Sequence, residues 1–116
     1  MRHTMKLHPN PFRMIVCGDK MYELRLYDEK RQCIKIGDAI EFVNTKTQEQ
    51  LVVRVKNIHI FKSFTELYQS MPLLKCGYTE EDVATANPAD MEKYYSKEQQ
   101  AQYGVVAFEI ERITEQ

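Results

Sequence analysis

The sequence predicts an α+β fold, a small and mostly antiparallel β-barrel flanked by short helices. Three segments alternate apolar and polar residues with the period of a strand, at residues 39–44, 50–61 and 105–113. Between them lie short segments that begin with helix-capping residues and end at glycine or proline. A last strand that pairs with earlier ones closes a sheet of this kind, which is why a small barrel is expected.

Length and composition indicate one folded domain over residues 1–116. The chain has 116 residues, of which 43% are hydrophobic and 28% charged, enough for one core and too few for two ordinary domains. No apolar run approaches the length of a membrane span, and residues 1–6 do not resemble a signal peptide. We therefore expect a cytoplasmic protein with no membrane partner.

Charge and cysteine content narrow the function classes. The formal net charge of −1 gives no overall attraction to nucleic acid, so such binding requires a local cationic patch. The three cysteines and three histidines are scattered and form no CxxC or zinc-ligand spacing. The sequence thus predicts no metal, no cofactor and reduced thiols, and it leaves the oligomeric state open.

The N-terminal third predicts a strand, a helix and a second strand. Residues 3–7 form the first strand, and Asn10 followed by Pro11 is typical of a helix start. An apolar stripe follows, and Gly18 ends the helix. The chain then enters an alternating strand, and the charged residues 28–32 are expected to form a turn.

The middle and C-terminal parts predict a hairpin, a helical insert and a closing strand. Strand 39–44 turns into strand 50–61, whose inward face changes near Asn57, which indicates a β-bulge. Ser63 caps a helix that Pro72 ends, and Asn87 and Ser96 cap two further short helices within residues 88–103. The final strand, 105–113, follows a glycine.

The segment from Gly18 to Asp28 is the candidate functional site. Its alternation places Glu23, Arg25 and Tyr27 on one side of a strand, opposite an apolar face, with Lys20 just upstream. This grouping is typical of a solvated strand face with an ion pair. It also suits a polar pocket for an anionic or nucleobase-like ligand, and the spacing alone does not separate these interpretations.

Together these segments resemble the ASCH domain, the activating-signal-cointegrator homology module of the PUA-like superfamily. The resemblance covers nearly the whole chain and is carried by Leu7-His8-Pro9-x-Pro11-Phe12, Gly18-x-Lys20-x-x-Glu23-x-Arg25, Ile36-Gly37-Asp38-x-Ile40-x-Phe42, Ser63-Phe64-x-Glu66-Leu67 and Tyr103-Gly104. It implies a β-barrel with a cleft into which the GxKxxExR residues project. It also implies binding of RNA or other nucleic-acid components.

The resemblance implies an enzymatic alternative as well. A small bacterial relative is an amidohydrolase that removes the acetyl group of N4-acetylcytidine with a lysine, a threonine and a glutamate. Its lysine falls on Lys20, but Glu23 stands at the threonine position and Lys75 or a neighbour stands near the glutamate position. Of the three catalytic residues of that relative, this sequence therefore matches only the lysine.

These residues allow different chemistries in the same cleft. For an RNA or nucleotide ligand, Lys20 and Arg25 would meet phosphate or base acceptors and Glu23 an exocyclic amine. A base could stack on Tyr27, on Tyr22 or on an aromatic residue of the helical insert (Tyr94, Tyr95 or Tyr103), and His8 would lie at the cleft mouth. For an amidohydrolase or a ribonuclease, Glu23 would act as base and Lys20 as its electrostatic partner. A protein-interaction module that uses the tyrosine-rich insert is a third class.

Overall fold

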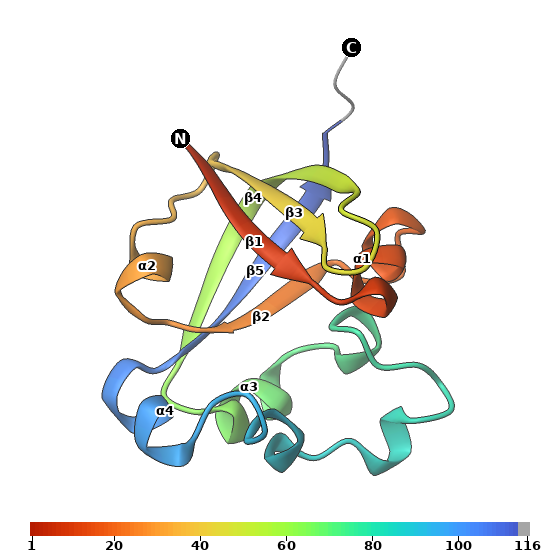
Figure 1. The fold of residues 1–116 in the computed structure, drawn as a ribbon. Coiled ribbons are helices and arrows are strands. Elements are labelled where there is room, and N and C mark those ends of the chain that lie inside the picture. The colour runs from red at the N-terminus through yellow and green to blue at the C-terminus, as the bar shows by residue number, and fades with distance from the viewer. Residues whose placement is uncertain (114–116) are drawn as a thin grey trace.

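Five strands form one curled sheet that determines the architecture (Figure 1). The computed structural model describes residues 1–113. The strands are β1 (Arg2–Leu7), β2 (Tyr22–Leu26), β3 (Ala39–Asn44), β4 (Gln50–Phe61) and β5 (Val105–Arg112). They lie in the order β1-β3-β4-β5-β2; β1 runs parallel to β3, and the other pairs are antiparallel. The predicted α+β class is confirmed: the sheet curls as a half-barrel, with β1 and β2 at its edges.

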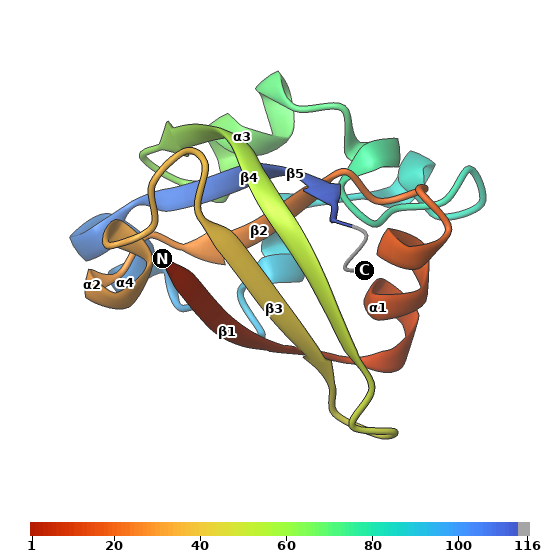
Figure 2. The same cartoon turned by 90° about the horizontal axis from the view of Figure 1, so that it is seen from above.

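Short helices cover the sheet and its ends. They are α1 (Pro9–Val16), α2 (Glu29–Gln32), α3 (Phe64–Ser70) and α4 (Lys97–Tyr103), with 3₁₀ turns η1 (Leu73–Lys75), η2 (Val83–Thr85) and η3 (Pro88–Met91). Residues 71–96, called the insert below, join α3 to α4 beneath the sheet. Viewed from above, α1 lies at one end of the sheet, and α2 and α4 lie at the other (Figure 2).

Two hydrophobic clusters meet at β5, which is buried on both faces. Val106 and Phe108 belong to the first cluster, which β1, β3, β4 and α1 complete. Val105 and Ala107 point the other way into the second cluster, together with Phe64 of α3. All five residues are completely buried.

The predicted irregularity in the long strand is present. The β4–β5 register shifts between Val55 and Asn57, as expected of a β-bulge, and bulges increase the local bend and twist of a strand. The entry to β5 is equally constrained, because Gly104 has φ +74° and an added Cβ would lie 2.9 Å from the carbonyl oxygen of Phe61. Glycine is required there.

The predicted start of α1 is wrong by two residues. His8, not Asn10, is the capping residue, and the helix begins at Pro9. Pro9 already supplies the fixed φ and the missing N–H that favour proline in the first turn. The Asn10 side chain instead accepts a hydrogen bond from the Arg13 guanidinium at 3.1 Å.

The charged segment 28–32, expected as a turn, contains the single helical turn α2. The Asp28 side chain accepts from the backbone N–H of Arg31 at 3.1 Å and caps this turn. A cap of this kind satisfies a free helix amide, which lets even a four-residue helix form.

The glycine-aspartate turn before β3 is held by one carboxylate. Asp38 Oδ2 lies 2.8 Å from Nε2 of His3 in β1 and accepts from the backbone N–H of Lys35 at 3.0 Å. These hydrogen bonds lower the pKa of Asp38 from 3.8 to about 2. The carboxylate therefore stabilises the fold above pH 3.8, and this contribution is lost as the pH falls through about 2.

Substitution of Asp38→Asn should lower the melting temperature at pH 7, and the difference from wild type should shrink between pH 4 and pH 2. Circular dichroism melts at intervals of half a pH unit measure it. Asp19→Asn, at an exposed position, serves as the control and should change little at any pH. A pH-independent difference for Asp38→Asn would show that the ionised carboxylate is not what stabilises the turn.

Candidate functional site

Three charged side chains form a buried ionic trio, defined as Lys20, Glu23 and Arg25. Lys20 Nζ lies 2.8 Å from Glu23 Oε1, and Arg25 Nε donates to Glu23 Oε2 at 2.7 Å. Their side chains are 9%, 3% and 15% exposed, respectively. A solvated strand face, the alternative left open by the sequence, is therefore excluded for these residues.

Local structure places the trio. α1 ends at Val16 and the chain turns at Gly18, which has φ +86°; the backbone N–H groups of Asp19 and Lys20 both donate to the carbonyl oxygen of Met14. The chain then enters β2, where Glu23 pairs with Phe108 of β5 and therefore lies on the face of the first hydrophobic cluster. Arg25, two residues on, shares that face because side chains alternate along a strand.

Arg25 also joins the two edges of the sheet. Its Nη2 donates to the carbonyl oxygen of Lys6 in β1 at 2.8 Å, although β1 and β2 are not neighbours in the sheet order. The side chain of Tyr95 in the insert also interacts with Arg25 and contributes to its raised pKa. One guanidinium thus connects β2, β1 and the insert, a geometry that a planar, five-donor group allows.

The electrostatics of the trio determine what Glu23 can do. Burial by itself would raise the pKa of Glu23, but the charges and hydrogen bonds of Lys20 and Arg25 outweigh it and hold the pKa below 4.5. Burial by itself would lower the pKa of Arg25, but Glu23 and Tyr95 outweigh it and raise the pKa. Glu23 is therefore ionised at neutral pH with both oxygens engaged. This geometry favours a carboxylate that positions two cations over one that accepts a proton.

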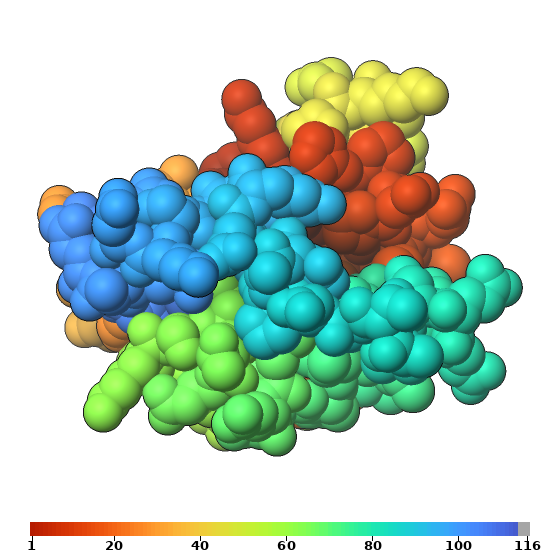
Figure 3. Space-filling view, turned by 90° about the horizontal axis from the view of Figure 1, so that it is seen from below, coloured from red at the N-terminus to blue at the C-terminus, as the bar shows by residue number. Residues whose placement is uncertain are grey.

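The trio opens into a pocket of about 580 Å³ between the N-terminal segment and the insert. Figure 3 shows the face where these parts meet, with α1 and β1 in red to orange and the insert in cyan to light blue. The lining residues come from four segments: Lys6, Leu7, His8, Asn10, Pro11, Met14, Lys20, Glu23, Leu24, Arg25, Tyr68, Cys76, Gly77, Tyr78, Asp82, Thr85, Asp90, Met91, Lys93, Tyr94 and Tyr95. We call it the trio pocket.

A chain of hydrogen bonds forms another part of the pocket wall. The hydroxyls of Tyr68 and Tyr78 lie 2.6 Å apart, and Tyr78 donates to Asp90 Oδ2 at 2.8 Å. Burial raises the pKa of both tyrosines, so their hydroxyls stay protonated at neutral pH. Burial also raises the pKa of Cys76 to about 11, which makes this thiol a poor nucleophile.

The predicted site residues fall into two groups. His8 lines the trio pocket together with the trio, whereas Tyr27 does not line it and packs against the first hydrophobic cluster. β2 ends at Leu26, so the strand alternation that placed Tyr27 beside Arg25 does not extend to it. Tyr68, Tyr78 and Asp90 were not predicted, because the sequence does not show that α3 and the insert fold back onto β2.

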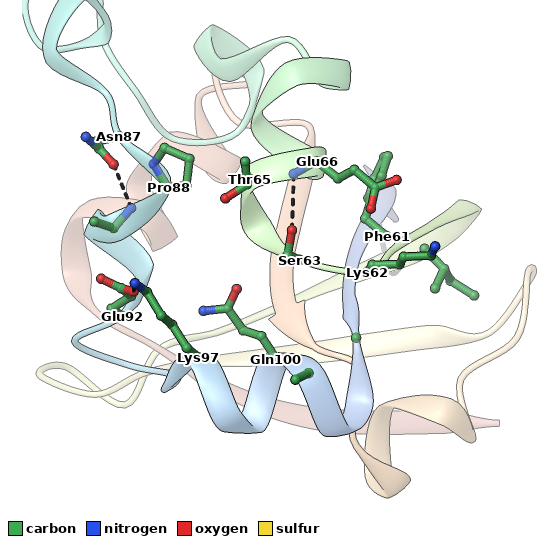
Figure 4. A pocket seen from close by; sticks show the side chains of 14 residues that line it. Phe61, Lys62, Ser63, Thr65, Glu66, Asn87, Pro88, Glu92, Lys97 and Gln100 are labelled. Carbon is green, nitrogen blue, oxygen red and sulfur yellow. Dashed lines mark hydrogen bonds and ion pairs between the residues drawn. The ribbon is translucent and has the colours of Figure 1, made fainter.

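A second, larger groove of about 1140 Å³ lies elsewhere, between the end of β4, α3, η3 and α4 (Figure 4). Among its charged side chains, Lys97 is 88% exposed, and Glu92, whose carboxylate lies 3.6 Å from the Lys97 ammonium, is 34% exposed. Its buried polar residue, Gln100, already accepts from the backbone N–H of Phe64 and donates to the carbonyl oxygen of Tyr95. This groove lacks a buried charge comparable to Glu23, so the trio pocket is the stronger candidate site.

Among residues 1–113, no group of three or more histidine, cysteine, aspartate or glutamate side chains is arranged to hold a metal ion. Within the same described range, none of the helices is both long and apolar enough to cross a membrane.

A curled five-stranded sheet with short helices at its ends and beneath it defines a small α+β domain of the PUA-like class. The chain belongs to the ASCH domain family, whose family model matches residues 5–114. The resemblance carried by the sequence motifs is thereby confirmed. No curated protein matches the chain.

Solved structures support the same assignment. The crystal structure of hypothetical protein PH0355 is 37% identical, covers 97% of this chain and 100% of its own, and superposes with a TM-score of 0.79. The solution NMR structure of protein PF0455 from Pyrococcus furiosus is 35% identical over 99% of this chain and 100% of its own, with a TM-score of 0.76. The ASCH structure from Zymomonas mobilis, at 14% identity over 97% of this chain and 70% of its own, shares the fold with a TM-score of 0.67.

Proposed function

We propose that this ASCH domain binds RNA or a nucleotide-like ligand in the trio pocket. The observation that carries the proposal is the buried ionic trio at a pocket of about 580 Å³ that several tyrosines also line. Small-molecule pockets typically measure roughly 300–1,000 Å³ and combine apolar walls with a few well-placed polar groups.

The cations keep donors for a ligand. Lys20 has three N–H donors and Arg25 has five, of which Glu23 and the Lys6 carbonyl oxygen engage only some. Phosphate oxygens and base carbonyls are suitable acceptors for the remainder. Glu23 then acts by holding both cations in position, because its two oxygens are already engaged.

The pocket also supplies aromatic surface and a rim. Tyr94 and Tyr95 contribute rings on which an unstacked base can pack, the usual way in which proteins hold single-stranded RNA. His8, the residue just before α1, also lines the pocket and is exposed to solvent. Tyr27 has no part in this proposal.

Substitution of Lys20→Met should weaken binding of a short single-stranded RNA by about tenfold or more, the usual scale for losing a hydrogen bond to a charged group. Methionine keeps most of the length of the side chain and removes the charge. Fluorescence anisotropy with a labelled oligonucleotide of mixed sequence, at two salt concentrations, measures the dissociation constant. Wild-type binding should weaken with salt, and the variant should show a smaller salt dependence.

Lys62→Met is the matched control, because Lys62 lies in the second groove and is exposed. It should bind RNA as wild type does. Equal loss in both variants, or binding indifferent to Lys20→Met, would contradict the proposal.

Incubation of the protein with N4-acetylcytidine and with the same RNA, followed by chromatography, tests the enzymatic alternatives. Binding without turnover is the result expected from the engaged state of Glu23. Deacetylation or RNA cleavage that Lys20→Met abolishes would instead assign the pocket to an amidohydrolase or a ribonuclease.

A further inference from the structure

We infer that the trio pocket accepts one nucleotide unit bearing a single phosphate group, and that it holds the base of this unit against Tyr94. The inference rests on the proposed function and specifies its ligand. A free mononucleotide and one nucleotide of an RNA chain share a base, a ribose and one phosphate group.

The charge of the pocket wall limits the number of phosphates. Four cationic side chains and three carboxylates line it, which leaves one excess positive charge with His8 neutral. The cations are Lys6, Lys20, Arg25 and Lys93, and the carboxylates are Glu23, Asp82 and Asp90. A phosphodiester carries one negative charge and balances this excess, and a terminal monophosphate, at about −1.5 to −2, exceeds it only slightly. A triphosphate would bring several uncompensated negative charges into a wall that contains two aspartates.

The deepest charges reinforce this limit. Glu23 is 3% exposed and contacts both cations of the trio, so at neutral pH its charge offsets one of theirs. The trio as a whole therefore offers a single net positive charge, on donors that belong to two different side chains. Lys20 and Arg25 can therefore donate to one anionic group together, but the trio offers no further cation for a second or third phosphate.

The position of the base is inferred from Tyr94, an aromatic side chain that is partly exposed in the pocket. Tyr94 lines the pocket and is 54% exposed, so part of its ring is accessible to a ligand. Lys93 Nζ lies 5.2 Å from the centroid of its ring, and Tyr95 lies at 6.5 Å with a tilt of 55°, so neither ring stacks flat on the other. Because Lys93 Nζ lies over one face of the Tyr94 ring, a nucleobase would pack on the face that Lys93 leaves open.

The test is a calorimetric titration of the protein with the four ribonucleosides, their 5′-monophosphates, their 5′-triphosphates and ribose 5-phosphate. At least one monophosphate should bind, and its nucleoside and ribose 5-phosphate should each bind about tenfold more weakly or worse, because each lacks one of the two contacts. The matching triphosphate should bind more weakly than the monophosphate. A triphosphate that binds more tightly, or ribose 5-phosphate that equals the monophosphate, would overturn the inference.

Two variants locate the contacts. Tyr94→Ala should weaken the monophosphate by about tenfold, since stacking on an aromatic ring contributes about 1–3 kcal/mol per base, and should leave ribose 5-phosphate unchanged. Asp82→Asn keeps an oxygen that can accept from Thr79 and removes one negative charge, so it should raise triphosphate affinity relative to monophosphate affinity by about twofold or more. Ile60→Ala, in the second groove, is the control for both.

The outcomes separate the inference from the function on which it rests. If single-stranded RNA binds in a Lys20-dependent way but every monophosphate fails, the one-nucleotide inference is wrong and the proposed function stands. If neither RNA nor any mononucleotide binds, both are wrong.

Discussion

Replacement of Glu23 with glutamine is expected to lower the free energy of unfolding by about 3–5 kcal/mol, the usual cost of removing one partner from a buried ion pair. The side chain keeps its shape, but Lys20 and Arg25 would then lie beside each other without the carboxylate that separates and neutralises them. Urea denaturation followed by circular dichroism gives the free energy directly.

The same variant has a pH signature. The pKa of Glu23 is held below its usual 4.5 by the two cations, so the carboxylate stabilises the fold above pH 4.5, and this contribution declines as the pH falls through the lowered pKa. The gap between wild type and Glu23→Gln should therefore narrow below pH 4.5. Glu111→Gln is the control, because its partner Lys56 lies at 4.0 Å and both side chains are nearly half exposed. It should change stability by less than about 1 kcal/mol; a comparable loss in both would mean that burial of the trio contributes nothing.

Phe64→Ala is the second substitution with a large expected effect, about 3–5 kcal/mol, because it removes a completely buried ring. The ring of Phe64 stacks on Tyr95 at 6.0 Å with an interplanar angle of 18° and meets Tyr68 edge to face at 6.5 Å. Both tyrosines line the trio pocket, so their loss of support should weaken ligand binding as well. Denaturation and RNA titration of the same preparation measure the two effects.

Phe42→Ala separates these effects. Phe42 is also completely buried, but it lies in β3 within the first hydrophobic cluster and does not line the pocket. The two alanine variants should lose similar stability, and only Phe64→Ala should lose affinity at a temperature where both are folded. Equal affinities for the two variants would contradict the assigned role of Phe64.

The strands that alternate with a clear period were predictable from the sequence. The bounds 39–44 and 50–61 agree with β3 and β4, and the change of phase near Asn57 corresponds to the observed bulge. Period-two patterns and capping residues are local signals, so they identify elements well. The start of α1 was mispredicted because Pro9 gives the same helix-start signal as Pro11. The helical turn in segment 28–32 depends on one capping hydrogen bond from the Arg31 N–H to Asp28, which leaves no periodic pattern.

The site was predictable only in the part that lies within one strand and its turn. Lys20, Glu23 and Arg25 are close in sequence, and a strand after a glycine-ended helix brings them together. The contact of Arg25 with the Lys6 backbone leaves no trace in residue identity, because every residue has a carbonyl oxygen. The walls from α3 and the insert depend on how a 3₁₀-rich segment folds back, which no local period specifies.

The bond from Arg25 to the Lys6 carbonyl has an evolutionary consequence. The Arg25 guanidinium that would contact the ligand also links β2 to β1, the two edge strands of the half-barrel. A substitution of Arg25 should therefore change both stability and ligand binding, and it cannot change ligand recognition without also changing the stability of the sheet. The insert, in contrast, lines the pocket but contributes no strand to the sheet. We therefore expect descendants of such a chain to acquire new ligands through changes in the insert, while the floor of the pocket stays as it is.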